Sequence, residues 1–589
     1  MVESIVKTLY LNAKYGRDAR GKTEKIRDDA LLYVVARSDG TRALKMKKCP
    51  EYKFYVSKKD LGYHRFSVPI EDVDPIVCKY ANRHDEMAKI IGISDQFKQA
   101  KSDWKTKRDW ISRNIYGNSR LYRADLDIED AFKLEFNEKN GDHTADIEYR
   151  TSFMDIETRA DLGDFDQHKA VVPICSICHL DSSTKTIYVN VLRDPLVTMI
   201  DEVFGNLAGF VDYMNDYLQI VRNEAMVAIK ADNGNPDSID DFMFSYKFCL
   251  VDNEADLIKA WAYVLNITSP DFCACWGINY DMNMIKNRAA KLGLDMAELF
   301  SDNLVPPEYK YFAYIEDRDR HEPGSQTHYS RYVDKILTSS KTQLYCQMSL
   351  HSNLRRRFLE ENYKLDTMGE KYAYIKKVDL KAEGVTIKNA YTKNFRVFLK
   401  YAIVDVIVQY MIERANGDIP RYMISCKDSR FTHGTKKTIG IKNELAIFLK
   451  ESKGHIIGNN KVYDISEPVP GAIIASPNLI EKKGMNIMGV DTHIYENCVD
   501  FDVEAEYPSI YIAYNILKTT IYGRITMIYF ARDIGDSRKI NVPISDGATF
   551  NKMLETIDTS IFDIGEKYFG LPGVDDILAQ IEKSCLKAI

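Results

Sequence analysis

The stretch Phe153–Thr158, which reads FMDIET, decides how the rest of the chain is interpreted. It opens an apolar, β-branched region, which predicts a strand at a buried edge. Alternate side chains of a strand share a face, so Asp155 and Glu157 point to the same side. Met154 and Ile156 then face the opposite layer. Two like charges side by side need a cation, so the pair predicts a divalent-metal site, with an ordinary solvated strand face as the alternative.

Length and composition indicate a large globular protein. A chain of 589 residues has room for about three or four domains, each with its own core. Its 45% hydrophobic residues and mean hydropathy of −0.33 are ordinary values that give no sign of disorder. The net charge of −6 argues against electrostatic coating of nucleic acid over the whole surface. It leaves open a nuclease that gathers acid at its site and base in its grooves.

The lack of a recognisable targeting signal and the cysteine usage both favour the cytoplasm. No apolar run reaches membrane-spanning length and no charged-then-apolar leader follows Met1, so we expect neither membrane insertion nor secretion by a signal peptide. Eleven scattered cysteines fit reduced thiols better than a disulfide framework.

Two cysteine spacings resemble metal sites. Cys175-x-x-Cys178-His179 has the form of a haem-attachment or metal knuckle, and Cys273-x-Cys275 could complete a zinc quartet. Residues three apart on a strand face opposite ways and cannot chelate one ion, so we reject both sites and expect buried structural thiols.

A junction between a strand and a helix supplies a third carboxylate. We expect a helix that begins at Asn253, followed by a short apolar strand at Phe272–Trp276 and a second helix towards Leu292. Asp281 then lies where the strand passes into the second helix, a place where functional carboxylates are often presented. Its alternative role is a helix N-cap.

A long helix supplies a fourth carboxylate and a tyrosine. The pattern predicts a helix from Phe395 to Ala415, closed by Asn416-Gly417 in a left-handed cap. Tyr401 and Asp405 are four residues apart and share one face of it. Polar side chains are rare inside so apolar a helix, which favours a functional role for the pair.

The chain divides into four predicted regions. Residues 1–148 form an α+β N-terminal domain, and residues 149–416 alternate strands with helices, which predicts an α/β domain or a mixed sheet covered by helices. Residues 417–490 return to the N-terminal domain or form a linker. Residues 491–589 begin with a strand at Cys498–Val503.

Some segments have the composition of nucleic-acid contacts. Lys45–Lys59 and Lys98–Arg113 are basic and carry aromatic residues, although lysines more often form a solvated face. Residues 302–340 predict a long loop or a projecting hairpin. Its aromatic residues alternate in part with charges, as a contact near a nucleic-acid template would require; they are Tyr309, Tyr311, Phe312 and Tyr314.

The strand carboxylates, the junction carboxylate and the helix pair, in this order, resemble the three exonuclease motifs of family B DNA polymerases. The proofreading domains of that family belong to the tyrosine branch of the DEDD superfamily. The strand and helix motifs are close to the family pattern. The middle motif departs from it, because Asn279 directly precedes Tyr280-Asp281, where family members usually have two or three intervening residues.

A fourth motif extends the resemblance to the polymerase itself. Asp502-Val-Glu-Ala-Glu-Tyr507-Pro-Ser is similar to motif A, Asp-x-x-Ser-Leu-Tyr-Pro-Ser, with two departures in the middle. The preceding Glu467–Pro470 is similar to the T-even phage branch. The resemblance implies that Asp502 holds both catalytic metals of the polymerase site and that Tyr507 lies under the incoming sugar. The fingers motif Lys-x-x-x-Asn-Ser-x-Tyr-Gly and a palm Asp-Thr-Asp do not occur in the sequence.

The resemblance implies the N-terminal subunit of a split DNA-dependent DNA polymerase, with a ribonuclease H-like 3′–5′ proofreading exonuclease domain and a partial palm. Two Mg²⁺ ions are implied at the exonuclease site, with Mn²⁺ as substitute, and Tyr401 would orient the attacking water. Across the exonuclease and polymerase sites, the implied metal ligands are Asp155, Glu157, Asp281, Asp405 and Asp502.

The implied partners are primer–template and single-stranded DNA, deoxynucleoside triphosphates, a sliding clamp, and a second chain with the fingers, the remaining palm and the thumb. The implied location is the cytoplasm of an infected bacterial host. Two alternatives stay open, namely a stand-alone 3′–5′ exonuclease with a non-catalytic palm remnant and a non-catalytic nucleic-acid-binding protein.

Overall fold

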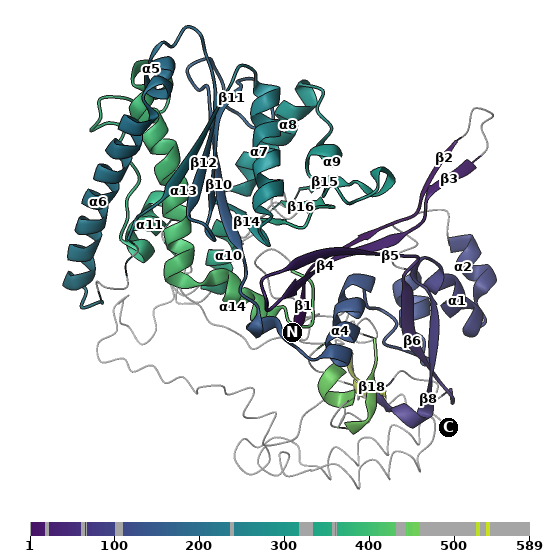
Figure 1. The fold of residues 1–589 in the computed structure, drawn as a ribbon. Helices are drawn as coiled ribbons and strands as arrows, with labels where there is room; N and C mark the ends of the chain where they lie inside the picture. Colours follow the sequence, from purple (N-terminus) through teal and green to yellow (C-terminus); the bar gives the residue numbers. More distant parts are fainter. Residues whose placement is uncertain are drawn as a thin grey trace.

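The computed structural model describes residues 2–459 and the paired strands β19 (Thr526–Phe530) and β20 (Ser537–Asn541) (Figure 1). Within the first range it leaves out 18–22, 61–64, 66, 101–109, 236–238, 240, 317–333, 356–359, 361, 432–442, 444–445 and 451–452. The described chain is a multidomain mixture of helices and strands, which confirms the predicted α/β and α+β class.

A six-stranded mixed sheet organises the larger lobe. Its strands lie in the order β13-β12-β11-β10-β14-β17. The FMDIET stretch belongs to β10 (Thr151–Thr158), which is antiparallel to β11 (Ile174–Asp181) and parallel to β14 (Phe272–Cys275). The expected edge position is therefore wrong, because β10 is paired on both sides. The sheet is completed by β12 (Thr186–Leu192), β13 (Ser245–Val251) and β17 (Gln343–Cys346).

Helices cover both faces of this sheet (Figure 1). Met154 and Ile156 pack in one layer with Trp261 and Met282, as the strand alternation predicts. That layer contains α7 (Glu254–Thr268), α8 (Ile278–Lys291) and α9 (Met296–Leu299). The opposite layer contains α5 (Met199–Gly205), α6 (Leu207–Ala231), α10 (Gln347–Leu354), α11 (Leu365–Ala373), α12 (Ala390–Lys393) and α13 (Phe395–Asn416).

Two helix ends confirm the capping signals in the sequence. The Asn253 Oδ1 atom accepts a hydrogen bond of 2.9 Å from the Asp256 backbone N–H and caps α7. Gly417, with φ of 60°, ends α13 in the left-handed conformation that glycine tolerates best. The cap fixes the length of α13, the helix that carries Tyr401 and Asp405.

The alternation that we used to separate Cys175 from Cys178 fails in the structure. Glu157 pairs with Ser176 and Thr158 pairs with Ile174, so Cys175 is an extra residue in the ladder. Because of this bulge, both cysteines pack in the same apolar layer. Both are buried free thiols, and burial raises the pKa of each thiol. Burial therefore disfavours the thiolate form that metal binding requires.

The N-terminal lobe is built on two three-stranded sheets, β1-β4-β5 and β8-β6-β9. The lobe combines strands with helices, as expected for residues 1–148. The observed elements are β1 (Glu3–Leu11), β4 (Ala30–Arg37), β5 (Arg42–Lys48), β6 (Glu51–Ser57), β8 (Val73–Lys79), β9 (Leu121–Tyr122), α1 (Arg83–Ile90), α2 (Ser94–Ala100) and α4 (Ile128–Asn140). Beyond the sheets, β2 (Lys14–Arg17) and β3 (Thr23–Arg27) form a two-stranded arm (Figure 1).

After α13 the chain packs against the N-terminal lobe. The segment passes through α14 (Asp418–Ser425), and Lys133 Nζ donates hydrogen bonds to the Cys426 and Ser429 carbonyl oxygens at 2.6 and 3.0 Å. Further on, β18 (His455–Ile457) pairs with β7 (Ser67–Pro69).

Buried polar contacts join the two lobes. Arg42 Nε and Nη2 each lie 2.7 Å from a carboxylate oxygen of Asp271. Lys7 Nζ donates hydrogen bonds to Thr338 Oγ1 at 3.1 Å and to the backbone oxygens of Ser340 and Thr342 at 2.9 and 2.7 Å. Burial lowers the pKa of the Lys7 ammonium to about 7. The lobes are therefore held by specific side chains as well as by apolar packing.

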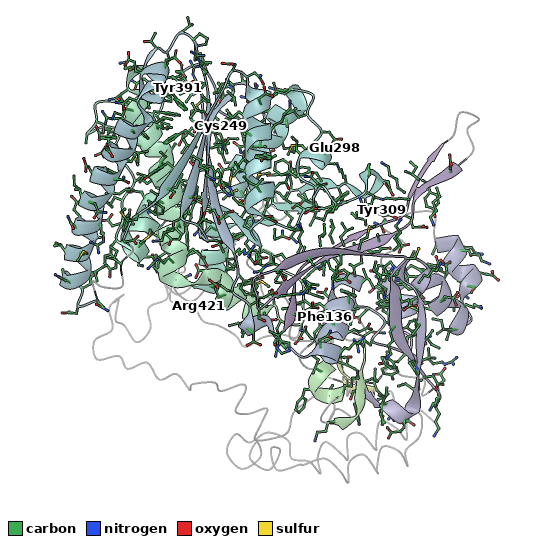
Figure 2. All side chains as sticks on the ribbon, in the orientation of Figure 1. Phe136, Cys249, Glu298, Tyr309, Tyr391 and Arg421 are labelled. Carbon is green, nitrogen blue, oxygen red and sulfur yellow. The ribbon has the colours of Figure 1, made fainter. Side chains whose placement is uncertain are left out.

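Residues 302–340 include the predicted hairpin strands, β15 (Phe312–Ile315) and β16 (Lys335–Thr338). The expectation that Tyr309 faces a nucleic-acid template is wrong, because it is only 1% exposed and packs with Leu9 and Leu32 of the N-terminal lobe. Figure 2 shows Tyr309 at this junction. The Tyr309 ring is buried at the interface between the lobes. The alternation of charges in the sequence gives no sign of that burial.

Several predictions fall on residues that the structure does not describe. Asp502, Tyr507 and the rest of motif A lie outside the described residues, as do most of the regions 417–490 and 491–589. Within the described part of the chain, no helix combines the length and the apolar character that crossing a membrane requires.

Candidate metal centre

Three carboxylates that lie far apart in the sequence meet beside the central strand. Asp155 and Glu157 project from β10, and Asp405 projects from α13 in the layer packed against that face. One carboxylate oxygen of each lies within 4.8 Å of those of the other two. Glu157 and Asp405 are buried, whereas Asp155 is only partly buried, so the cluster is open to solvent on one side. The structure therefore joins the strand motif to the helix motif.

Asp281 lies close to this cluster but outside the three-carboxylate group. It occupies the first turn of α8, directly after β14, and β14 pairs with β10. Its negative charge is the largest contribution after burial to the raised pKa of Asp155. The alternative role of an N-cap is wrong, because Gly277 holds that position. Asp281 adds charge to the cluster, and its role as a ligand stays a prediction.

Asn279, the departure in the middle motif, has a structural contact of its own. Its side-chain oxygen accepts a hydrogen bond of 2.8 Å from the Asp334 backbone N–H, just before β16. This bond ties the start of α8 to the hairpin. Asn279 thus connects the first turn of α8, which also carries Asp281, to residues 302–340.

The four carboxyl groups share a strong electrostatic penalty. Burial, followed by the charge of neighbouring carboxylates, raises the pKa of Asp155 and of Glu157, the latter to about 8. Burial is also the main cause of the raised pKa of Asp405 and of Asp281, which reaches about 8. Near neutral pH the cluster therefore holds protons or attracts cations, because repulsion between buried like charges disfavours full ionisation.

Lys377, which the sequence analysis did not identify, supplies one such cation. Its Nζ atom lies 2.5 Å from Asp405 Oδ2 and donates a hydrogen bond of 2.8 Å to the Tyr401 hydroxyl oxygen. Burial lowers the pKa of Lys377, but Asp405 and the nearby groups raise it by more, so the ammonium stays charged. Only the excess of negative charge in the predicted site hinted at a basic partner, and no spacing in the sequence located it.

Tyr401 lies beside the carboxylates with its hydroxyl held by Lys377. Burial and then the charge of Asp405 raise the pKa of the phenol, so the hydroxyl keeps its proton. Lys377 donates to the Tyr401 oxygen, and a hydrogen bond between Tyr401 and Asp405 acts to lower the pKa of the Asp405 carboxyl, against the larger effect of burial. A protonated hydroxyl held in this way can position a water molecule or a substrate oxygen.

The side chains present fit a hard divalent cation. All three grouped ligands are carboxylates, which Mg²⁺ and Mn²⁺ prefer over nitrogen or sulfur. Asp405 Oδ1 is buried and accepts no hydrogen bond from any described residue. A buried carboxylate oxygen without a donor is costly, and a bound cation would remove that cost. The cluster can therefore hold a metal ion.

Neither a scan against protein-family models nor a search of curated proteins finds a match to this chain.

Proposed function

We propose that this chain is a divalent-metal-dependent 3′–5′ exonuclease that acts on DNA and forms the N-terminal subunit of a split family B DNA polymerase. The observation that carries the exonuclease proposal is the meeting of Asp155, Glu157 and Asp405 within 4.8 Å. Asp281 and Tyr401 lie close enough to act electrostatically on this group or to feel its charge, which supports the proposal.

The proposed fold of residues 149–416 is ribonuclease H-like. Support comes from the mixed sheet, which has β10 in its interior and helices packed on both faces. Further support comes from the placement of the acidic side chains on that interior strand and on a helix that packs against it. A rigid sheet suits the task, because catalysis by positioned ligands tolerates little displacement.

The proposed reaction is hydrolysis of the terminal phosphodiester of a DNA strand. Water adds to phosphorus, the bond from phosphorus to the 3′ oxygen of the preceding nucleotide breaks, that oxygen takes up a proton, and a nucleoside 5′-monophosphate leaves. Asp155, Glu157 and Asp405 would hold two Mg²⁺ ions, with Asp281 adding negative charge. When bound, such ions would supply activation of the attacking water and neutralisation of the charge on the leaving oxygen.

The chain's own polar groups would orient the reactants. Tyr401 would donate its hydroxyl proton to the attacking water or to a phosphate oxygen, which would fix the direction of attack. Lys377 would keep the Tyr401 hydroxyl in place and offset negative charge that builds up on the phosphate. The partly exposed Asp155 marks the side from which the strand end would enter.

The direction of degradation gives a first test. The purified chain with Mg²⁺ should release nucleoside 5′-monophosphates from the 3′ end of a single strand. A label at the 5′ end should therefore persist on progressively shorter strands, while a label at the 3′ end should be lost at once. Release from the 5′ end, or internal cleavage, would contradict the proposal.

The split-polymerase proposal rests on the motif A resemblance and needs a separate test. The isolated chain should add no nucleotides, because one palm aspartate cannot hold two ions against an incoming triphosphate. Co-expression with a fragment carrying the fingers and palm motifs should restore templated synthesis, and Asp502→Ala should remove it while exonuclease activity persists. Failure of every such fragment to co-purify would favour the stand-alone exonuclease.

A further inference from the structure

The segment that carries Lys377 is attached to α13 at a second point. Lys400, five residues before Asp405 on α13, forms an ion pair with Glu383. The two attachments are reciprocal. At the first, a cation of the segment meets an anion of the helix, and at the second an anion of the segment meets a cation of the helix.

Lys400 is much more buried than the lysine of an ordinary surface ion pair. Its side chain is 3% exposed, and its Nζ atom lies 5.3 and 4.7 Å from the ring centres of Tyr213 and Tyr217 on α6. The ammonium is therefore enclosed by two aromatic rings and one carboxylate. A lysine so buried requires a specific partner, because an unpaired buried charge is strongly destabilising.

The segment between the two attachments is a compact turn. Asp379 Oδ1 accepts hydrogen bonds from the Lys381 and Ala382 backbone N–H groups at 2.9 and 3.2 Å. The Glu383 N–H donates to the Asp379 carbonyl oxygen at 3.2 Å. At either end of this turn, Val378 and Val385 are buried in the same apolar layer as α13. A turn with so many internal bonds transmits the position of one end to the other.

We propose that Glu383 is a positioning residue for Lys377, and that it acts through its ion pair with Lys400. The pair fixes the far end of the turn, and the turn holds the Lys377 ammonium against Asp405 and Tyr401. Among the described residues, the ion-pair partner of the Glu383 carboxylate is Lys400 and none of the cluster residues. The kinetic consequence rests on the proposed exonuclease function, whereas the consequence for metal binding does not.

Mn²⁺ binding to the full chain, followed by electron paramagnetic resonance, tests the proposal without any nuclease assay. Lys377→Met should tighten Mn²⁺ binding severalfold, because the ammonium competes with the ion for Asp405. Glu383→Gln should also tighten binding, because it loosens Lys377 from the same carboxylate. The double variant should bind no more tightly than Lys377→Met alone. Additive effects, or wild-type affinity in Glu383→Gln, would overturn the proposal.

Two further variants separate positioning from folding. Glu383→Gln combined with Lys400→Met removes the pair without leaving a buried ammonium, and it should give the same Mn²⁺ affinity as Glu383→Gln at a higher melting temperature. Glu370→Gln is the matched control. Glu370 pairs at 2.8 Å with Lys376, the residue before Lys377, and both side chains are more than half exposed. It should leave Mn²⁺ affinity unchanged, and an equal shift in this control would contradict the proposal.

Kinetics on single-stranded DNA provide the second measurement. Glu383→Gln should lower kcat about tenfold with little change in KM, the usual size of an effect exerted through a supporting residue. In the Lys377→Met background the same substitution should cause no further loss, and a further loss there would overturn the proposal. A wild-type chain that binds Mn²⁺ but degrades no DNA contradicts the exonuclease function alone, and the Mn²⁺ series still decides the role of Glu383.

Discussion

Lys377 Nζ lies 2.5 Å from Asp405 Oδ2, so a cation of the protein occupies one side of the carboxylate cluster. The other oxygen of Asp405 is buried and accepts no hydrogen bond from any described residue. One oxygen of Asp405 thus contacts the Lys377 ammonium, and the other is left for a bound metal ion. The Lys377 ammonium therefore offsets part of the negative charge of the cluster.

Replacing this lysine should make folding depend on metal. Lys377→Met removes the cation that offsets the buried carboxylates, so the melting temperature without divalent ions should fall below that of the wild type. Mg²⁺ should then raise the melting temperature of the variant by more than it raises that of the wild type, because the ion replaces the missing charge. Lys376→Met, which alters an exposed neighbour, is the control and should respond as the wild type does. Equal Mg²⁺ responses in all three proteins would show that Lys377 does not balance the cluster.

The roles of Tyr401 and Asp405 should differ in size. Tyr401→Phe keeps the ring and removes only the hydroxyl, so it should lower the exonuclease rate by about a hundredfold, a typical cost of misplacing a reactant. Asp405→Ala removes a proposed metal ligand and should lower the rate by more. Single-turnover rates on a 3′-labelled single strand measure both. A Tyr401→Phe rate below that of Asp405→Ala would reverse the assignment.

The sequence predicts the fold where local signals agree with tertiary demands. The Asn253 cap, the Gly417 cap and the alternation of β10 all appear as expected, because each depends on a few adjacent residues. The interior position of β10 and the burial of Tyr309 could not be predicted, because both depend on contacts with distant segments. The same reason explains why four acidic residues could be identified in the sequence and Lys377 could not. Carboxylates at strand and helix spacing form a recognisable pattern, whereas a single lysine in a turn does not.

A second buried acid predicts a specific pH dependence of stability. Burial, followed by the charge of Asp418, raises the pKa of Glu413 from its ordinary value of 4.5 to about 8. The folded state therefore binds a proton that the unfolded state releases above pH 4.5. This contribution to stability is fully present below about pH 4.5 and is lost as the pH rises towards 8.

Glu413→Gln should remove that dependence. The Ile419 backbone N–H donates a hydrogen bond of 2.8 Å to Glu413 Oε1. The Gln side chain resembles the protonated acid and keeps an oxygen that can accept this bond. The variant and the wild type should melt at similar temperatures near pH 4.5, and the variant should melt at the higher temperature near pH 8. Melting curves across this range provide the measurement. The quantity to compare is the melting temperature of the variant minus that of the wild type. If this difference is lower at about pH 8 than at about pH 4.5, Glu413 is ionised in the folded state and the prediction is wrong.

The ion pair between the lobes should contribute strongly to stability. The side chains of Arg42 and Asp271 are only 4% and 2% exposed, so Arg42→Met leaves a buried carboxylate without its partner. Loss of one partner of such a pair costs about 3–5 kcal/mol, whereas the double variant Arg42→Met with Asp271→Leu should cost less. Asp95→Asn is the control, because the Lys98–Asp95 pair is 70% and 90% exposed and should contribute about 0–1 kcal/mol. Chemical denaturation gives these values, and equal losses in Arg42→Met and Asp95→Asn would contradict the structural role.

The most direct test of the exonuclease proposal is the double substitution of the two strand carboxylates. Asp155→Ala with Glu157→Ala should abolish Mg²⁺-dependent removal of 3′ nucleotides from single-stranded DNA, while binding of the same strand stays measurable. Both quantities can be measured on one labelled oligonucleotide, with the wild type as reference. Loss of hydrolysis with retained binding is the predicted result. Hydrolysis at the wild-type rate by the pure double variant would contradict the assignment of this cluster as the catalytic site.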